Sequence, residues 1–325
     1  MADFDARDVL SDETWAAMTR LRVDDPEAVM AAARRRRKRP HLTADGRLVI
    51  VAADHPARMV TDVHPGDGRM ADRRDFLGRV IRALSADGVD GVMATPDVIE
   101  ELLLVELVPS DPGSELLAEK LLIGCMNRGG LAGAAWELDD RMTAFTPDRL
   151  VEMALDGAKV MCRLSLTEPA CLDTLVACAE AITECASRRL PVFLEVFMVE
   201  HTDEGWRAVR EPRSLTQAVS VASALGATSL GTWLKLPCCE GFEQVARATT
   251  LPILMLGGAA RGDDLAVLAE FAAGMAAGPN VRGCLVGRNV LYSASGDPLV
   301  MAAAVGRVVH DGLGPAEAYE KSSGG

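Results

Sequence analysis

The chain has 325 residues, of which 49% are hydrophobic and 25% charged, and its formal net charge at pH 7 is −13. This composition is ordinary for a globular protein, and the excess of negative charge argues against a nucleic-acid-binding surface. No apolar run is long enough to span a bilayer, and the acidic N-terminus lacks the apolar core of a signal peptide. We therefore expect a cytoplasmic protein that contacts neither nucleic acid nor membrane.

A basic run, Arg34 to Arg39, precedes the first expected strand. We interpret it as the solvated end of an N-terminal helix over residues 26–37, stopped by Pro40. A contact with a neighbouring subunit of a homo-oligomer, or with a substrate phosphate, is the alternative. The adjacent Cys238 and Cys239 suit neither a normal disulfide nor a zinc site, and their role stays open.

From residue 48 onward, short apolar segments alternate with longer amphipathic ones. The apolar segments predict strands over 48–54, 91–96, 121–127, 158–164, 191–199, 229–237, 252–258 and 281–289. The segments between them predict helices over 73–86, 97–107, 147–156 (capped by Thr146), 171–187, 214–225, 240–248, 263–277 and 298–310.

Strands that are short, apolar and separated by helices pair in parallel through right-handed crossovers. A doubly wound sheet also fits this alternation, but no Gly-x-Gly-x-x-Gly turn follows the first strand. We therefore predict an α/β fold, a (β/α)8 TIM barrel with an N-terminal helical extension. Residues 1–47 form the extension, 48–312 the barrel catalytic domain and 313–325 a C-terminal tail, whose last residues (KSSGG) we expect to be frayed.

The active site of such a barrel lies at the C-terminal ends of its strands. Lysine occurs at only five positions, and Lys235 alone is expected at such an end, whereas Lys159 is expected at the bottom of the fourth strand. Strand alternation puts Trp233 on the same face as Lys235, so we expect the indole to wall a pocket around the lysine. Burial there lowers the pKa of a lysine and makes it a nucleophile for a carbonyl carbon. A structural ion pair with a carboxylate is the alternative.

Several further polar residues are expected at the same end of the barrel. Glu195, within FLEVF, fits the role of proton shuttle for the lysine, or else of its ion-pair partner. Asp54 is expected to bind substrate hydroxyls or to act as a second acid or base. His55 is expected to contact the substrate, and the alternative is a structural role as a helix-cap or loop residue. Asn127, Arg128 and Arg163 complete the expected substrate contacts.

Two glycine-containing turns are expected after the seventh and eighth strands, at the phosphate site of many barrel enzymes. These are Gly257-Gly258 and Gly287-Arg288-Asn289. The five histidines are scattered, so we expect no metal site and no cofactor.

The segments WLKLPCCEGFEQVARATTLPILMLGG and CLVGRNVLYSASGDPLVMAAAVGRVVH resemble the class I, Schiff-base aldolases of the deoxyribose-phosphate, tagatose-bisphosphate and archaeal-type fructose-bisphosphate group. The resemblance implies imine formation at Lys235, substrate phosphate at the two glycine turns, and an Asp-His pair after the first strand. It covers roughly residues 48–310. Archaeal-type members use a tyrosine of the fifth strand as the acid, and this chain has none there, which leaves Glu195 for that role.

The overall resemblance is to an actinobacterial barrel subgroup associated with inositol catabolism. It implies cleavage of 5-dehydro-2-deoxy-6-phosphogluconate to dihydroxyacetone phosphate and malonate semialdehyde, with Arg128 or Arg163 at the substrate carboxylate. The partner is thus a phosphorylated sugar or sugar acid. A transaldolase-like synthase, a phosphosugar isomerase and a non-catalytic phosphosugar-binding barrel are the alternatives.

Overall fold

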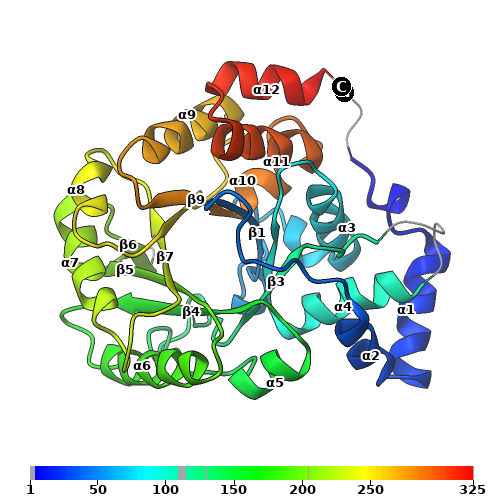
Figure 1. Ribbon diagram of the computed structural model, residues 1–325, viewed down its shortest axis with the longest axis horizontal. Coiled ribbons are helices and arrows are strands. Elements are labelled where there is room, and N and C mark those ends of the chain that lie inside the picture. Colours follow the sequence, from blue (N-terminus) through cyan, green and yellow to red (C-terminus); the bar gives the residue numbers. More distant parts are fainter. Residues whose placement is uncertain (1–3, 109–114, 129, 204, 325) are drawn as a thin grey trace.

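The computed structural model describes residues 4–108, 115–128, 130–203 and 205–324, and a closed barrel of eight parallel strands forms its centre (Figure 1). The strands follow the order β4-β3-β2-β1-β9-β8-β7-β5, and pairing of β4 with β5 closes the ring. Their bounds are β1 (Leu48–Ala53), β2 (Gly91–Ala94), β3 (Leu121–Cys125), β4 (Gly157–Leu164), β5 (Val192–Thr202), β7 (Thr232–Pro237), β8 (Ile253–Leu256) and β9 (Val281–Val286). The predicted (β/α)8 barrel is confirmed.

Helices surround the barrel and bury their apolar faces against the strands (Figure 1). The helices that follow successive strands are α3 (Arg73–Leu84), α4 (Pro96–Leu107), α5 (Pro147–Glu152), α6 (Cys171–Ser187), α7 (Pro212–Ser223), α8 (Phe242–Ala246), α9 (Asp264–Met275) and α11 (Pro298–Gly306), the last preceded by the short α10 (Arg288–Leu291). Thr146 caps α5 as predicted, accepting a hydrogen bond from the backbone N–H of Arg149 at 3.2 Å, but the helix ends at Glu152. None of the helices in the described ranges is long and apolar enough to cross a membrane.

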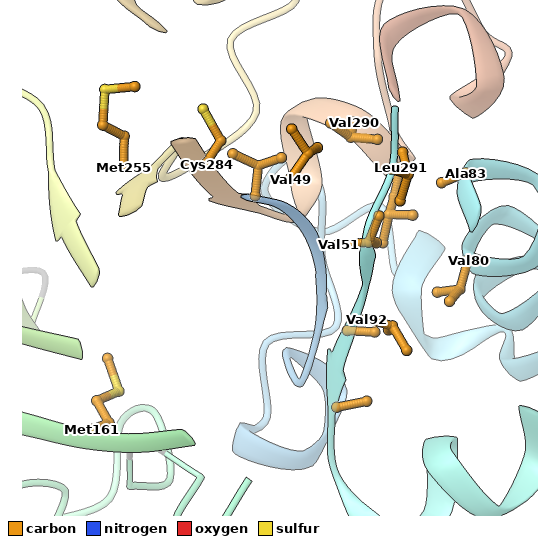
Figure 2. Close-up of a cluster of buried hydrophobic side chains, with 14 of the residues drawn as sticks. Val49, Val51, Val80, Ala83, Val92, Met161, Met255, Cys284, Val290 and Leu291 are labelled. Atoms are coloured by element: carbon orange, nitrogen blue, oxygen red, sulfur yellow. The ribbon is translucent and has the colours of Figure 1, made fainter. Parts of the chain in front are cut away.

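Side chains alternate between two apolar regions because successive residues of a strand point to opposite faces. Residues such as Leu48, Ile50 and Phe193 fill the interior of the barrel. Their neighbours pack outward against the helices, and Figure 2 shows such residues of β1 and β2, Val51 and Val92, near side chains of α3. The interior is therefore a packed core, and the polar side chains described below meet in it toward the C-terminal ends of the strands.

The fifth strand continues past its predicted end and forms a hairpin. β5 runs to Thr202 and pairs in antiparallel fashion with β6 (Gly205–Ala208), so that His201 lies opposite Trp206. The two rings meet edge to face, with their centroids 5.0 Å apart. The hairpin extends beyond the C-terminal end of the barrel and forms part of the wall of the cavity there.

The N-terminal extension contains two helices, α1 (Asp12–Asp24) and α2 (Ala28–Arg35), which lie beside α4 (Figure 1). The basic run begins in the last turn of α2, and Arg34, Arg35, Arg37 and Lys38 are exposed as predicted, whereas Arg36 and Arg39 are not. The side chain of Arg36 is 3% exposed and forms an ion pair with Asp156 at 2.7 Å, and Arg39 forms one with Asp90 at 2.9 Å. These pairs fasten the extension to the N-terminal end of the barrel.

The C-terminal segment is also more ordered than predicted. It forms the helix α12 (Pro315–Ser323), which packs on α9 and α11 through the buried Ala318 and through Tyr319. The expectation of a frayed end is therefore wrong for this stretch, because an apolar face gives the helix something to bury.

Candidate active site

Lys235 and Glu195 face each other inside the C-terminal half of the barrel. Their Cα atoms are register partners on the adjacent parallel strands β7 and β5, so both side chains point inward at the same level. Lys235 Nζ donates a hydrogen bond to Glu195 Oε2 at 2.8 Å, and both residues are buried. The structure thus joins the two residues that the sequence analysis proposed as nucleophile and proton shuttle.

Lys159 joins this pair, although its position in β4 was predicted to be remote from it. Its Cα lies level with Phe193, one inward layer below Glu195, but the long side chain carries the ammonium upward. Lys159 Nζ donates to Asp54 Oδ2 at 2.9 Å and lies 3.2 Å from Glu195 Oε2. We call Asp54, Lys159, Glu195 and Lys235 the ion cluster, and its two carboxylates and two ammonium groups balance in charge.

The ion cluster keeps its carboxylates ionised. Burial alone would raise the pKa of Glu195, but the ammonium groups of Lys235 and Lys159 outweigh burial and lower it to about 2. For Asp54 too, burial is outweighed by Lys159 and then by Lys235, and its pKa lies far below the usual range. In turn the pKa of Lys159 is raised, because Asp54 and Glu195 overcome its desolvation. Glu195 therefore rests as a carboxylate that accepts a hydrogen bond from the Nζ of Lys235.

His55 follows Asp54 and lies close under the turn after β9. Its Nδ1 is 3.9 Å from Asp54 Oδ1, and this buried nitrogen has no hydrogen-bond partner in the part of the chain that the structure describes. Burial lowers the pKa of His55 to about 3, against the raising effect of Asp54, so the imidazole is neutral near pH 7. A Cβ atom on Gly287 would lie 2.4 Å from His55 Cε1, so glycine is needed at this approach.

Above the ion cluster the barrel opens into a cavity of about 330 Å³. Eight of the predicted site residues contribute to its lining: His55, Arg163, Glu195, Lys235, Gly257, Gly258, Gly287 and Arg288. The predicted catalytic lysine and the two predicted glycine turns thus border the same space. Met161, Phe197 and Trp206 supply an apolar part of the wall.

The other five predicted residues lie within the described ranges but outside this lining. Asp54 belongs to the ion cluster and is buried. Asn127 uses its side-chain amide to bind backbone atoms of Met161 and Asp140, which ties the loop after β3 to β4. Asn289 likewise donates to the carbonyl oxygens of Gly257 and Ala259 and so shapes the turn after β8. Arg128 follows β3 without reaching the cavity.

Trp233 is the fifth of these residues, and it does point inward as alternation predicts. It lies one layer below Lys235, at the level of Phe193, and the two ring centroids are 6.0 Å apart. The indole therefore packs in the apolar floor of the barrel together with Leu42 and does not wall the lysine pocket.

Three arginines that line the cavity, Arg58, Arg207 and Arg210, were not predicted. Arg58 lies in the one-turn helix η2 (Pro56–Arg58), four residues after Asp54, where the strand-end criterion could have found it. Arg210 follows the β5–β6 hairpin, and no sequence signal placed that hairpin over the site. Arg163 was predicted, but its guanidinium donates to the side chain and the backbone carbonyl of Glu137, so its charge is already compensated.

The chain is 39% identical to Cgl0159 from Corynebacterium glutamicum, whose crystal structure aligns over 94% of this chain and 99% of that one with a TM-score of 0.87. Over 119 residues it is 30% identical to a protein of Enterobacter sp. (strain 638) named 3-hydroxy-5-phosphonooxypentane-2,4-dione thiolase. That stretch is 37% of this chain and only 38% of the thiolase-named relative.

More distant structures share the fold. An archaeal fructose-1,6-bisphosphate aldolase, solved with its catalytic lysine bound to the carbinolamine intermediate of the substrate, is 18% identical and aligns with a TM-score of 0.57 over 86% of this chain and 99% of its own. At this level of identity the likeness extends to the barrel alone. The family model described as Cgl0159-like matches residues 46–309, which include the whole barrel and the cavity, and the chain belongs to this Cgl0159-like family.

Proposed function

We propose that the chain is a class I aldolase, a lyase that cleaves or forms a carbon–carbon bond of a phosphorylated keto sugar or sugar acid through an imine on Lys235. The observation that carries the proposal is the 2.8 Å hydrogen bond from Lys235 to the ionised Glu195 at the floor of an anion-attracting cavity. A lysine must lose a proton before it can attack a carbonyl carbon, and Glu195 lies within reach of that proton.

The proposed reaction begins with proton transfer from Lys235 to Glu195. The neutral amine then attacks the substrate carbonyl carbon, and the carbonyl oxygen takes a proton from the attacking nitrogen to give a carbinolamine. Protonated Glu195 returns a proton to the departing hydroxyl, water leaves, and the imine forms. The protonated imine withdraws electrons from the neighbouring carbon–carbon bond, which breaks as a hydroxyl on the far carbon gives its proton to the Glu195 carboxylate, releasing the first product and leaving an enamine. Glu195 returns this proton to the enamine carbon, and water then hydrolyses the imine, which releases the second product and restores Lys235.

His55 and Asp54 have supporting roles in this proposal. A neutral imidazole with a pKa of about 3 is a poor base but a good hydrogen-bond partner for a substrate hydroxyl. Asp54 holds Lys159 in place and does not touch the cavity, so we assign it to positioning.

The glycine turns after β8 and β9 are proposed to hold the substrate phosphate. Gly257, Gly258 and Gly287 border the cavity, and Arg288 adds a guanidinium beside them. Gly258 has a φ of +71°, and a Cβ atom there would lie 2.4 Å from Nη2 of Arg210. Backbone N–H groups and guanidinium forks are suited to phosphate oxygens.

The proposed substrate in its most specific form is 5-dehydro-2-deoxy-6-phosphogluconate, which yields dihydroxyacetone phosphate and malonate semialdehyde in inositol catabolism. The resemblance that suggested it supports this choice, together with the arginines of the cavity. We further propose a cytoplasmic homo-oligomer.

Borohydride trapping tests the imine. Intact-protein mass spectrometry after incubation with dihydroxyacetone phosphate and borohydride should show one reduced adduct, and peptide mapping should place it on Lys235. Lys235→Ala should abolish the adduct, whereas Lys321→Ala, which removes an exposed lysine of α12, should leave it unchanged. An unmodified wild-type protein, or an adduct on another lysine, would refute the proposal.

A second candidate is carbon–carbon cleavage with transfer of an acyl group to a thiol. The similarity to a relative named a thiolase favours it. The two reactions differ in what completes the turnover: an aldolase releases both products in buffer, whereas a thiolase needs an added thiol such as coenzyme A.

A further inference from the structure

Three arginines line the cavity without a carboxylate partner. Arg58, Arg210 and Arg288 all border the space above Lys235, and within the described ranges none of them forms an ion pair. The Nε atoms of Arg58 and Arg288 are buried and have no hydrogen-bond acceptor among those residues. A buried guanidinium with unsatisfied donors is costly, which indicates that an anionic ligand supplies the missing acceptors.

The three guanidinium groups occupy different parts of the mouth of the barrel. Arg210 lies over Gly258 in the turn after β8, and Arg288 follows β9. Arg58, which follows β1, reaches toward β4, where its Nη1 is 3.9 Å from Met161 Sδ, a weak acceptor. Burial, and then the charge of Arg58, lower the pKa of Arg288, so these two cations repel each other across the cavity.

The count of charges favours a ligand with two anionic groups. The ion cluster below is neutral, Arg163 is paired with Glu137, and Arg207 has an interaction of its own. Among the described residues that line the cavity, Arg58, Arg210 and Arg288 are therefore the cations to be matched. A phosphate group carries a charge of about −1.5 to −2 near neutral pH. A phosphate therefore leaves about one cation unmatched, and a single carboxylate matches it.

We infer that Arg58 is a specificity-determining residue that binds a carboxylate of the substrate, while Arg210 and Arg288 hold its phosphate at the glycine turns. This inference rests on the proposed imine chemistry at Lys235. It selects phosphorylated keto acids over simple keto sugar phosphates, with the carbonyl between the two anionic groups. It also replaces Arg128 and Arg163, the carboxylate partners expected from the sequence.

Two carbonyl probes that each carry one of the anionic groups separate the two subsites. The half-saturating concentration for borohydride trapping is measured with dihydroxyacetone phosphate and with levulinate, a keto acid without phosphate. Arg58→Gln should raise the value for levulinate by about tenfold or more, since it removes a charge-assisted hydrogen bond, and should change that for dihydroxyacetone phosphate less than about twofold. Arg210→Gln should show the reverse pattern.

Arg282→Gln is the matched control, because Arg282 lies near the start of β9, at the opposite end of the barrel from Arg288. It removes the same charge and should alter neither value. Arg58→Lys retains the charge but loses the two parallel N–H donors of the guanidinium, so its half-saturating concentration for levulinate should lie between those of wild type and Arg58→Gln. This variant also serves as the test if Arg58→Gln does not fold. Equal weakening of both probes by Arg58→Gln, or no change with either, would overturn the inference.

Titration calorimetry measures binding at the proposed carboxylate and phosphate subsites independently of imine formation. Malonate and inorganic phosphate bind without forming an imine, so both can be titrated into Lys235→Ala protein and into the Arg58→Gln, Lys235→Ala double variant. Loss of malonate binding alone in the double variant supports the carboxylate subsite, even where no probe is trapped on Lys235. Malonate binding that does not depend on Arg58 overturns it.

Discussion

Replacing Lys159 by methionine tests whether the ion cluster is held together by charge balance. Lys159 Nζ lies 2.9 Å from an oxygen of Asp54 and 3.2 Å from one of Glu195. At an effective dielectric constant of about 20, each contact corresponds to about 5 kcal/mol of attraction, part of which offsets desolvation of the ions. We expect the variant to lose about 3 to 5 kcal/mol of the free energy of unfolding at pH 7, as when one partner of a buried ion pair is removed.

The loss should depend on pH with a definite sign. In the wild type the pKa of Glu195 is about 2, below its ordinary value, so its stabilising contribution is present above about pH 4 and disappears toward pH 2. Without Lys159, two carboxylates share one ammonium, and one of them binds a proton more tightly in the folded state than in the unfolded state. The difference in stability between wild type and variant should therefore narrow from pH 7 to pH 4.

Urea denaturation followed by circular dichroism at pH 7, 5.5 and 4 measures both effects. Adding Asp54→Asn to Lys159→Met removes the surplus negative charge, and we expect the double variant to regain about 2 kcal/mol. Lys120→Met is the control: Lys120 donates to the backbone carbonyl of Val89 and has no carboxylate partner in the described ranges, so its loss should not vary over this pH interval. A loss below about 1 kcal/mol for Lys159→Met, or a difference that stays constant with pH, would refute the reasoning.

Three further predictions concern other parts of the molecule. Hydrogen bonds that His310 donates to Asp90 and Asp45 outweigh burial and raise its pKa to about 9, so its stabilising contribution is present below about pH 6.5 and is lost as the pH rises through 9. His310→Gln should thus unfold more easily than wild type by about 1 to 2 kcal/mol at pH 6 and equally at pH 10, and an equal gap at both pH values would contradict this. Gly258→Ala and Gly262→Ala should each lower the free energy of unfolding by about 1 kcal/mol, because both glycines have a left-handed backbone conformation. Only the new methyl group at position 258 would contact Arg210, so only Gly258→Ala should weaken the inhibition of imine trapping by inorganic phosphate. Asn127→Ala should lower the free energy of unfolding by about 2 to 4 kcal/mol, measured by urea denaturation, because buried backbone groups lose their partners; a loss under 1 kcal/mol would speak against the clamp.

The barrel could be predicted because each of its strands and helices has a recognisable local sequence pattern, short and apolar for the strands and amphipathic for the helices. Helix α1 could not, since only Thr14 and Met18 of its residues are buried and its apolar pattern is correspondingly weak. The β5–β6 hairpin was missed because the half-exposed and exposed residues of β6 show no burial alternation. Elements that pack on the outside of a complete domain bury few residues, so their hydrophobic patterns are the weakest in the sequence.

The candidate site was predictable to the extent that strand ends determine it. That criterion found Lys235, Glu195 and Asp54, and register then brings the first two together. It missed Lys159 because the criterion places a residue by its Cα atom, whereas a lysine side chain spans more than one layer of the barrel. Arg210 depends on a hairpin that the pattern does not contain, so only the folded chain reveals it.

The neutrality of the ion cluster bears on how imine chemistry can proceed inside an apolar barrel. Moving net charge into a low-dielectric interior is expensive, whereas a proton that passes from Lys235 to Glu195 over 2.8 Å leaves the total charge of the cluster at zero. Before the transfer three ion pairs link the four groups, and after it Asp54 and Lys159 remain as one pair beside two neutral groups. Lys159 lowers the pKa of Glu195 and so holds it ionised before the transfer, and its ion pair with Asp54 keeps that carboxylate compensated after the transfer.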